Sequence, residues 1–143
     1  MIARSAEGGM RDAISLTDQL LSYGGDVITE AQVQAVRGAI SGEAISRLTD
    51  FLLAGDAAGG LGLLNQLVED GIDLRQLGVQ LVAWLRSVLV CSVGGKQARA
   101  LLPDLSDTAW QSVQNQAART RADALTAAVR QFNEAVHAMR DAL

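Results

Sequence analysis

Apolar residues recur along most of the chain at the three- and four-residue spacing of amphipathic helices. The segments that show this spacing lie at about 1–6, 10–23, 29–37, 41–55, 56–68, 73–94, 95–102, 106–117 and 122–143. Strand-like runs are confined to 27–29 and 88–91, and the second of these continues a longer helical period. The pattern predicts an all-α fold.

Residues that start or stop helices mark several of these boundaries. Asp56 and Asp73 can accept hydrogen bonds from the first backbone amides of the helices that follow them, and Ser106 or Asp107 can begin another. Gly55 and the glycine pair at 94–95 suit the turns that end helices. We therefore expect separate helices on either side of residues 55 and 95.

The longest apolar run follows Asp73 and predicts the central helix of the core. Its face, widened by Val82 and Trp84, consists of Leu74, Leu77, Leu81, Leu85, Val88 and Leu89. The last helix carries a narrow heptad seam suited to face another helix, formed by Leu125, Val129, Phe132, Val136, Met139 and Leu143. The expected faces of two shorter helices are Ile45, Leu48, Phe51 and Leu52, and Leu61, Leu64, Leu67 and Val68.

A shift in composition near residues 38–41 predicts two domains, 1–38 and 39–143. The chain begins inside a helical pattern and ends on the seam residue Leu143. We therefore expect it to be an excised piece of a longer protein, truncated at its C-terminus. Apolar surface that intact neighbours would cover predicts self-association that depends on concentration.

Composition excludes several classes of protein. A chain of 143 residues with 49% hydrophobic residues can bury a core without disulfides, and the single Cys91 cannot form one internally. The net charge of −4, with no block of like charges, argues against an electrostatic grip on nucleic acid by the whole chain. The longest apolar stretch, 81–93, is too short to span a bilayer, and no signal peptide opens the chain. These features predict a soluble, cytoplasmic protein without membrane partners.

The inventory of catalytic groups is poor. His137 is the only histidine and sits on the last helix, where a partly exposed side chain is expected. Cys91 lies in an apolar helix, in which a free thiol usually behaves as a small hydrophobe. The sequence shows no cluster of metal-ligating residues at a recognisable spacing, and no Walker A or Rossmann motif. We predict no catalytic residue and no metal site.

One constellation points to phosphate binding. Gly8 and Gly9 allow a tight turn into a new helix, whose first backbone amides are unpaired and partly positive. Arg11 in that first turn adds a forked, charged donor. The alternative is a simple joint between helices, with Arg11 on the surface beside Asp12 or Glu7.

The same region resembles one family of AAA+ ATPases. The stretch ARSAEGGMRDAISLTDQ, residues 3–19, is similar to the sensor 2 segment of the gamma/tau subunits of bacterial DNA polymerase III, with the pattern A-x-x-A-x-G-x-x-R-D-A-x-S-L-x-D-Q. Tyr23-Gly24-Gly25 and residues 36–38 continue it. Beyond residue 38 the likeness is one of layout, in which residues 71–74 and 132–135 resemble parts of the collar domain.

This resemblance implies a helical lid remnant followed by a helical-bundle collar. The family uses ATP to open a sliding clamp and place it on primed DNA, and its sensor 2 arginine, here Arg11 after Gly8 and Gly9, contacts the ATP phosphates. The implied partners are other gamma/tau copies, delta and delta-prime through the collar, and the clamp and primed DNA through the whole complex. Because the P-loop, Walker B acid and arginine finger of the family are absent here, the fragment alone is expected neither to hydrolyse ATP nor to bind it well, and ATP is expected as a cofactor of the full-length parent only.

Two other interpretations fit the same residues. The chain could be the lid and collar of a different AAA+ ATPase, such as a replication-factor-C-like or recombination-factor protein, although Asp18-Gln19 argues against this. It could also be a stand-alone helical adaptor or oligomerisation module with no ATPase connection.

Overall fold

The computed structural model describes residues 40–142, and the compact unit within this range begins at Gly42. These residues form helices and no strand, which confirms the predicted all-α class for the part described. The elements are α4 (Gly42–Ala54), α5 (Ala57–Glu69), α6 (Leu74–Gly94), η1 (Gly95–Gln97), α7 (Ala98–Leu101), α8 (Asp107–Ala118) and α9 (Ala122–Ala142). The helices predicted before residue 38, and the predicted domain boundary there, lie outside the described residues.

The predicted helix starts and stops are confirmed. The side chain of Asp56 accepts a hydrogen bond from the Gly59 amide at 2.9 Å, and that of Asp73 accepts one from the Gln76 amide at 2.8 Å. Ser106 does the same for α8 through the amide of Ala109, at 3.1 Å. Gly55 and Gly95 end their helices with φ values of +71° and +55°, which glycine adopts without a Cβ clash.

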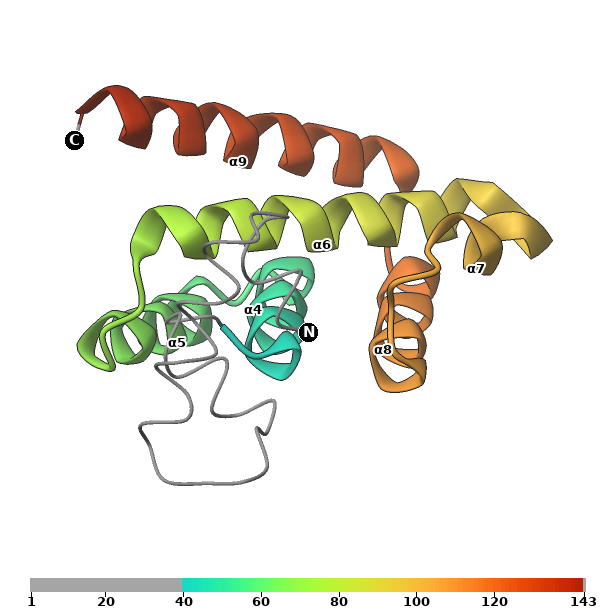
Figure 1. Cartoon of the computed structure of the whole chain (residues 1–143), viewed down its shortest axis with the longest axis horizontal. Helices are drawn as coiled ribbons and strands as arrows, with labels where there is room; N and C mark the ends of the chain where they lie inside the picture. The colour runs from blue at the N-terminus through green and yellow to red at the C-terminus, as the bar shows by residue number, and fades with distance from the viewer. Residues whose placement is uncertain (1–39, 143) are drawn as a thin grey trace, which may run out of the picture. The chain divides into compact units, whose positions relative to one another are not determined.

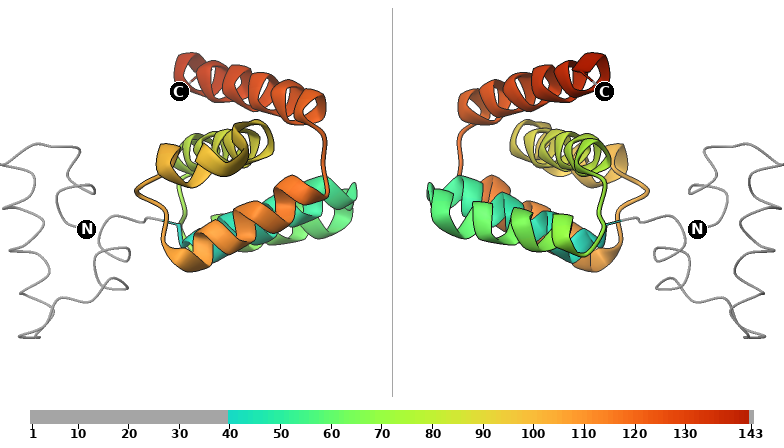
Figure 2. Two further views of the ribbon diagram at one scale, coloured as in Figure 1. Left: turned by 90° about the vertical axis from the view of Figure 1, so that its right-hand side faces the viewer. Right: turned by 90° about the vertical axis from the view of Figure 1, so that its left-hand side faces the viewer.

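The helices lie in three layers with α6 in the middle. Figures 1 and 2 show α9 running along one side of α6, while α4, α5 and α8 lie on the other side. α6 packs against α9, α8 and α4, and α5 packs mainly against α4. The prediction that the helix after Asp73 is central is therefore confirmed.

The core lies on both packed sides of α6. Leu85 is 1% exposed and Val88 fully buried, and Val113 of α8 and Leu125 of α9, the helices that pack on α6, are buried as well. Two members of the predicted face depart from expectation: Leu74, in the first turn of α6, is 46% exposed, and Leu89 is half-buried. The predicted face was wider at its ends than the neighbouring helices can cover.

Small residues let α6 and α9 approach closely. A Cβ on Gly78 of α6 would lie 2.6 Å from Cγ2 of Val136 on α9, closer than real Cβ contacts. Leu125 and Val136 of the predicted seam are buried, and the half-buried members are Val129, Phe132 and Met139. Because α9 packs on α6, α6 covers the described part of the seam partly, and Leu143 lies outside the description.

α5 is covered on a different side from the one expected. Its buried side chain is Leu63, whereas Leu61 and Val68 of the predicted face are 59% and 47% exposed. On α4, Ile45 and Leu48 are buried as predicted, but Leu52 is 40% exposed. Before its last residue, Glu69, α5 carries no charge that would mark a solvent side, so its apolar pattern could not indicate which side meets the core.

The structure also corrects the prediction that the longest apolar stretch of the chain is too short to span a bilayer. The consecutive elements α6, η1 and α7, Leu74–Leu101, are together long and apolar enough to cross a bilayer by length and composition alone, so residues 81–93 understate the apolar segment. Leu81, Leu85 and Val88 are buried against other helices of the unit. That burial is the pattern of a core helix.

Candidate functional site

The residues predicted to contact phosphate lie outside the described part. Gly8, Gly9 and Arg11 precede residue 40, so their geometry is not described and their role stays a prediction. The side-chain geometry that the structure describes belongs to the helical unit from Gly42 onwards.

The two residue types with catalytic potential are isolated in this unit. His137 is exposed on α9, as expected of a helix histidine. Cys91 is half-buried on α6, and burial raises the pKa of its thiol, which lowers the fraction of reactive thiolate. Among residues 40–142, no group of three or more His, Cys, Asp or Glu side chains is arranged to hold a metal ion.

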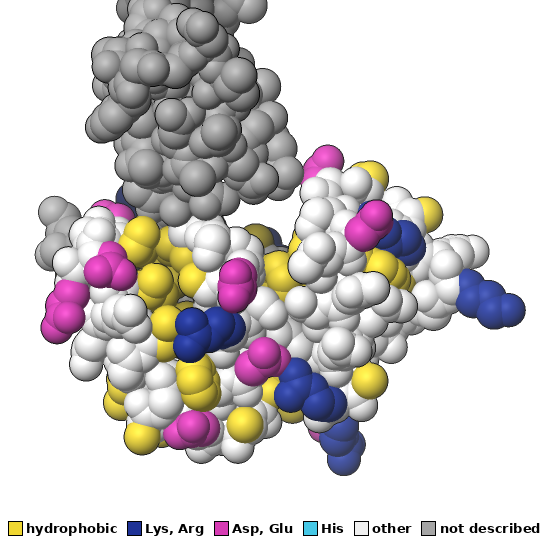
Figure 3. Space-filling view, turned by 90° about the horizontal axis from the view of Figure 1, so that it is seen from below, with side chains coloured by type: hydrophobic (Ala, Val, Ile, Leu, Met, Phe, Trp, Pro, Cys, Tyr) yellow, Lys and Arg dark blue, Asp and Glu magenta, His cyan; other side chains and the backbone are white. Residues whose placement is uncertain are grey.

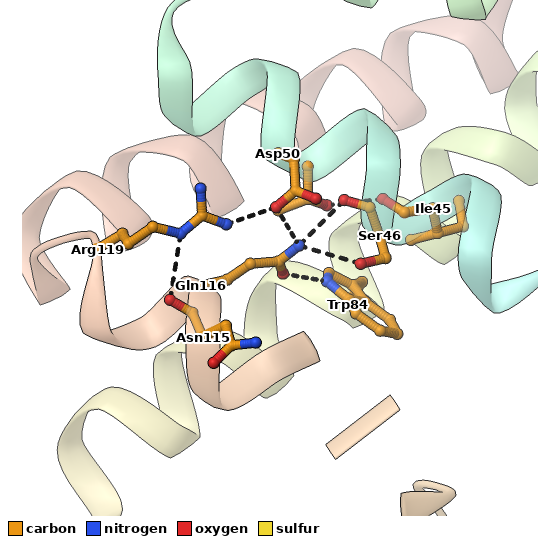
Figure 4. Close-up of polar contacts among 8 residues, drawn as sticks. Ile45, Ser46, Asp50, Trp84, Asn115, Gln116 and Arg119 are labelled. Carbon is orange, nitrogen blue, oxygen red and sulfur yellow. Dashed lines mark hydrogen bonds and ion pairs between the residues drawn. The ribbon is translucent and has the colours of Figure 1, made fainter. Parts of the chain in front are cut away.

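A polar network centred on Gln116 joins three helices (Figure 4). Its Oε1 accepts a hydrogen bond from Trp84 Nε1 of α6 at 2.7 Å. Its Nε2 donates to Asp50 Oδ1 at 3.0 Å and lies within hydrogen-bond distance of Ser46 O and Oγ, at 3.0 and 3.2 Å. At the rim, Arg119 donates to the same Asp50 oxygen at 2.6 Å.

This network fixes how α4, α6 and α8 pack. Gln116 is only 1% exposed, so losing one partner would leave a buried polar group unsatisfied, at a cost of about 1 to 3 kcal/mol. The Asp50–Arg119 pair is half exposed and contributes about 0 to 1 kcal/mol. Trp84 was predicted only as part of an apolar face. The partnership with Gln116, 32 residues away, has no local signal in the sequence.

Arg99 holds the connection between α7 and α8. Its guanidinium donates to the backbone carbonyls of Leu102 and Leu105 at 2.7 and 2.8 Å. It also lies 3.5 Å from a carboxylate oxygen of Asp107 and 5.4 Å from the ring centroid of Trp110. These contacts give Arg99 a structural role in this turn.

The feature that remains for function is uncovered apolar surface. Figure 3 shows hydrophobic side chains gathered on the left of the viewed face, over α4 and α5. The large hydrophobic residues that are exposed are Leu52, Leu61, Val68, Leu74, Val79, Val93 and Leu101. Such surface is typical of a protein that docks on another, and the described residues offer no comparable arrangement for catalysis.

Two family models match the chain in tandem. Residues 1–26 match the ATPase lid domain of the DNA polymerase III clamp loader subunit, and residues 28–132 match domain III of the DNA polymerase III subunits gamma and tau. The second match covers well over half of the chain and includes α4 to α8 and the first half of α9.

Curated relatives agree with these matches. The chain is 34% identical over 90 residues to DNA polymerase III subunit tau of Bacillus subtilis, covering 63% of this chain and 16% of that protein. It is 28% identical over 88 residues to subunit tau of Escherichia coli (62% and 14%), and 28% over 127 residues to subunit gamma/tau of Mycobacterium bovis (88% and 22%). The chain spans less than a quarter of the length of these relatives. It belongs to the DNA polymerase III gamma/tau family, of which it carries the clamp-loader lid and domain III regions.

Proposed function

We propose that this chain supplies two parts of a clamp-loader subunit, a lid that senses ATP through Arg11 and a collar that joins subunits. The observation that carries the proposal is the order of the two matches, lid over 1–26 and domain III over 28–132, in one chain. The RDA-x-SL-x-DQ pattern at 11–19 supports the role of Arg11, and the exposed apolar residues of the described unit support assembly.

In the full-length parent, ATP would lie between the ATPase domain and the lid. Gly8 and Gly9 would turn the chain so that first-turn amides and Arg11 face the phosphates. This chain would add binding and orientation, and the hydrolytic groups would come from the ATPase domain of the parent. The collar would hold other gamma/tau copies, delta and delta-prime in one cytoplasmic complex that acts on the sliding clamp and primed DNA.

Substitution of Arg11 in the full-length parent tests this function. We expect Arg11→Ala to slow ATP-dependent clamp loading, and Arg11→Lys to restore it only in part because a point charge lacks the guanidinium fork. Arg4→Ala is the matched control, since Arg4 occupies a variable position of the pattern. The melting temperature of the 143-residue chain should change little with Arg11→Ala. Unchanged loading by Arg11→Ala would contradict the sensor role.

A further inference from the structure

α8 is held on the unit by little apolar surface. Its buried side chains are those of Val113 and Gln116, and Trp110 is half-buried. α9, by comparison, buries both Leu125 and Val136 and packs on α6. Apolar contact has no preferred direction, so one buried valine brings α8 close to its neighbours without fixing its rotation. The orientation of α8 therefore depends on its polar contacts.

The polar contacts that reach the core from α8 come from Gln116. Its side chain lies between Trp84 of α6 on one side and Ser46 and Asp50 of α4 on the other (Figure 4). Ser46 and Asp50 are four residues apart and so share one face of α4. Arg119 reaches the same Asp50 oxygen from the half-exposed rim. One buried side chain thus ties α8 to two helices at once.

The partners of Gln116 leave its amide one orientation. The indole N–H of Trp84 can only donate, so Oε1 faces α6. The ionised Asp50 carboxylate and the Ser46 carbonyl can only accept, so Nε2 faces α4. A shift of α8 by one residue turns it by about 100° and carries the amide away from these partners.

We infer that Gln116 is a conformational lock, which selects one arrangement of α8 on α4 and α6 from several that apolar contact alone would allow. In any other arrangement the amide would be buried without its partners, and burial of an unpaired polar group is unfavourable. A nonpolar side chain of similar size at position 116 removes this penalty and admits the other arrangements. The lock acts within the described unit and is separate from the proposed role of Arg11.

Indole N–H signals in NMR spectra of the 143-residue chain test the lock, because both of its tryptophans lie at α8. Trp84 contacts Gln116, and Trp110 is part of α8 itself. Gln116→Met keeps the length of the side chain and removes the amide. We expect the two sharp indole signals of the unaltered chain to split into more than two or to broaden through exchange. Gln111→Met, at an exposed position of the same helix, is the matched control and should keep two sharp signals.

Gln116→Glu makes the lock depend on pH. When protonated, the introduced carboxyl group has a carbonyl oxygen for Trp84 and an O–H for Asp50, which is the polarity of the amide. When ionised, it cannot donate to α4 and is repelled by Asp50, whose carboxylate Arg119 already pairs; Trp84 brings no charge from α6. The single arrangement is therefore present at low pH and lost as the pH rises, so the extra indole signals should disappear as the pH falls from about 8 to about 6. Gln111→Glu and the unaltered chain should keep two signals throughout.

A residue that only stabilised the unit would give a different result. Two sharp signals for Gln116→Met, even with a lower melting temperature, would overturn the lock. Signals of Gln116→Glu that stay the same from high to low pH would also overturn it. If Gln116→Met fails to fold, the spectra of Gln116→Glu decide, and a chain that is unfolded at both pH values contradicts the lock as well.

Discussion

α9 and α5 both lie in outer layers, and each packs mainly against one helix (Figure 2). The two helices differ in the residues on the side that faces away from that neighbour. α9 buries Leu125 and Val136 against α6 and turns residues such as Arg130 and Glu134 to solvent. α5 buries Leu63 against its neighbour but leaves Leu61 and Val68 exposed. A helix with one apolar side buries its apolar surface against a single neighbour, whereas a helix with two apolar sides leaves apolar surface exposed after that contact forms.

The largest expected effect separates the covered core from the exposed side of α5. Leu85→Ala on α6, at 1% exposure, should lower the free energy of unfolding by about 2 to 5 kcal/mol because it leaves a cavity. Leu61→Ala on α5 should cost far less, and His137→Ala on the outer side of α9 should cost little. Chemical denaturation of the three variants at low protein concentration measures this. Equal losses of stability for Leu85→Ala and Leu61→Ala would show that Leu61 is part of the core.

Two glycine-to-alanine substitutions compare the contact between α6 and α9 with the exposed side of α5, and their expected effects on stability are smaller. Gly78→Ala puts a methyl group 2.6 Å from Cγ2 of Val136 and should destabilise the chain by about 1 to 3 kcal/mol by forcing α6 and α9 apart. Gly62→Ala on α5 meets nothing within 4 Å and should stabilise the chain by about 0.5 to 1 kcal/mol through helix propensity. The two melting temperatures should move in opposite directions. A loss of stability at both sites would mean that the space beside Gly62 is filled.

Loss of a helix cap gives the most local expected effect. Asp56→Ala removes the acceptor for the Gly59 amide and should cost about 1 kcal/mol. Because α5 packs mainly on α4, we expect the loss to appear as local fraying of 57–61, with faster amide exchange there and unchanged exchange in α9. Asp123→Ala, at the start of α9, is the comparison. Fraying that spread through α9 would contradict independent local stability of the two helices.

The sequence predicted the elements that depend on local chemistry. Asp56, Asp73 and Ser106 cap their helices as expected, Gly55 and Gly95 end them, and the apolar run after Asp73 is the central helix. These features need only neighbouring residues, whose spacing a single sequence displays. The sensor 2 pattern around Arg11 is likewise local, and it led to the family before any contact was known.

The sequence could not predict what depends on distant neighbours. The spacing of apolar residues placed Leu61 on the expected face of α5 and left out Leu63, whereas packing on α4 buries Leu63 and leaves Leu61 exposed. Gln116 is buried in a contact with Trp84 and Asp50, which lie on two other helices. The residues next to position 116 in the sequence give no sign that this glutamine lies in the core. The geometry around Gly8, Gly9 and Arg11 falls outside the described residues, so that part of the site stays a prediction.

The central claim is that α9 has its apolar side covered by α6, whereas α5 leaves the apolar side chains of Leu61 and Val68 exposed. Amide hydrogen exchange of the 143-residue chain tests this most directly, because a helix with fewer buried apolar contacts opens locally at a lower free energy. We predict that the amides of α5 (57–69) exchange faster than those of α9 (122–142). Exchange in α5 that is as slow as exchange in α9 would contradict the account.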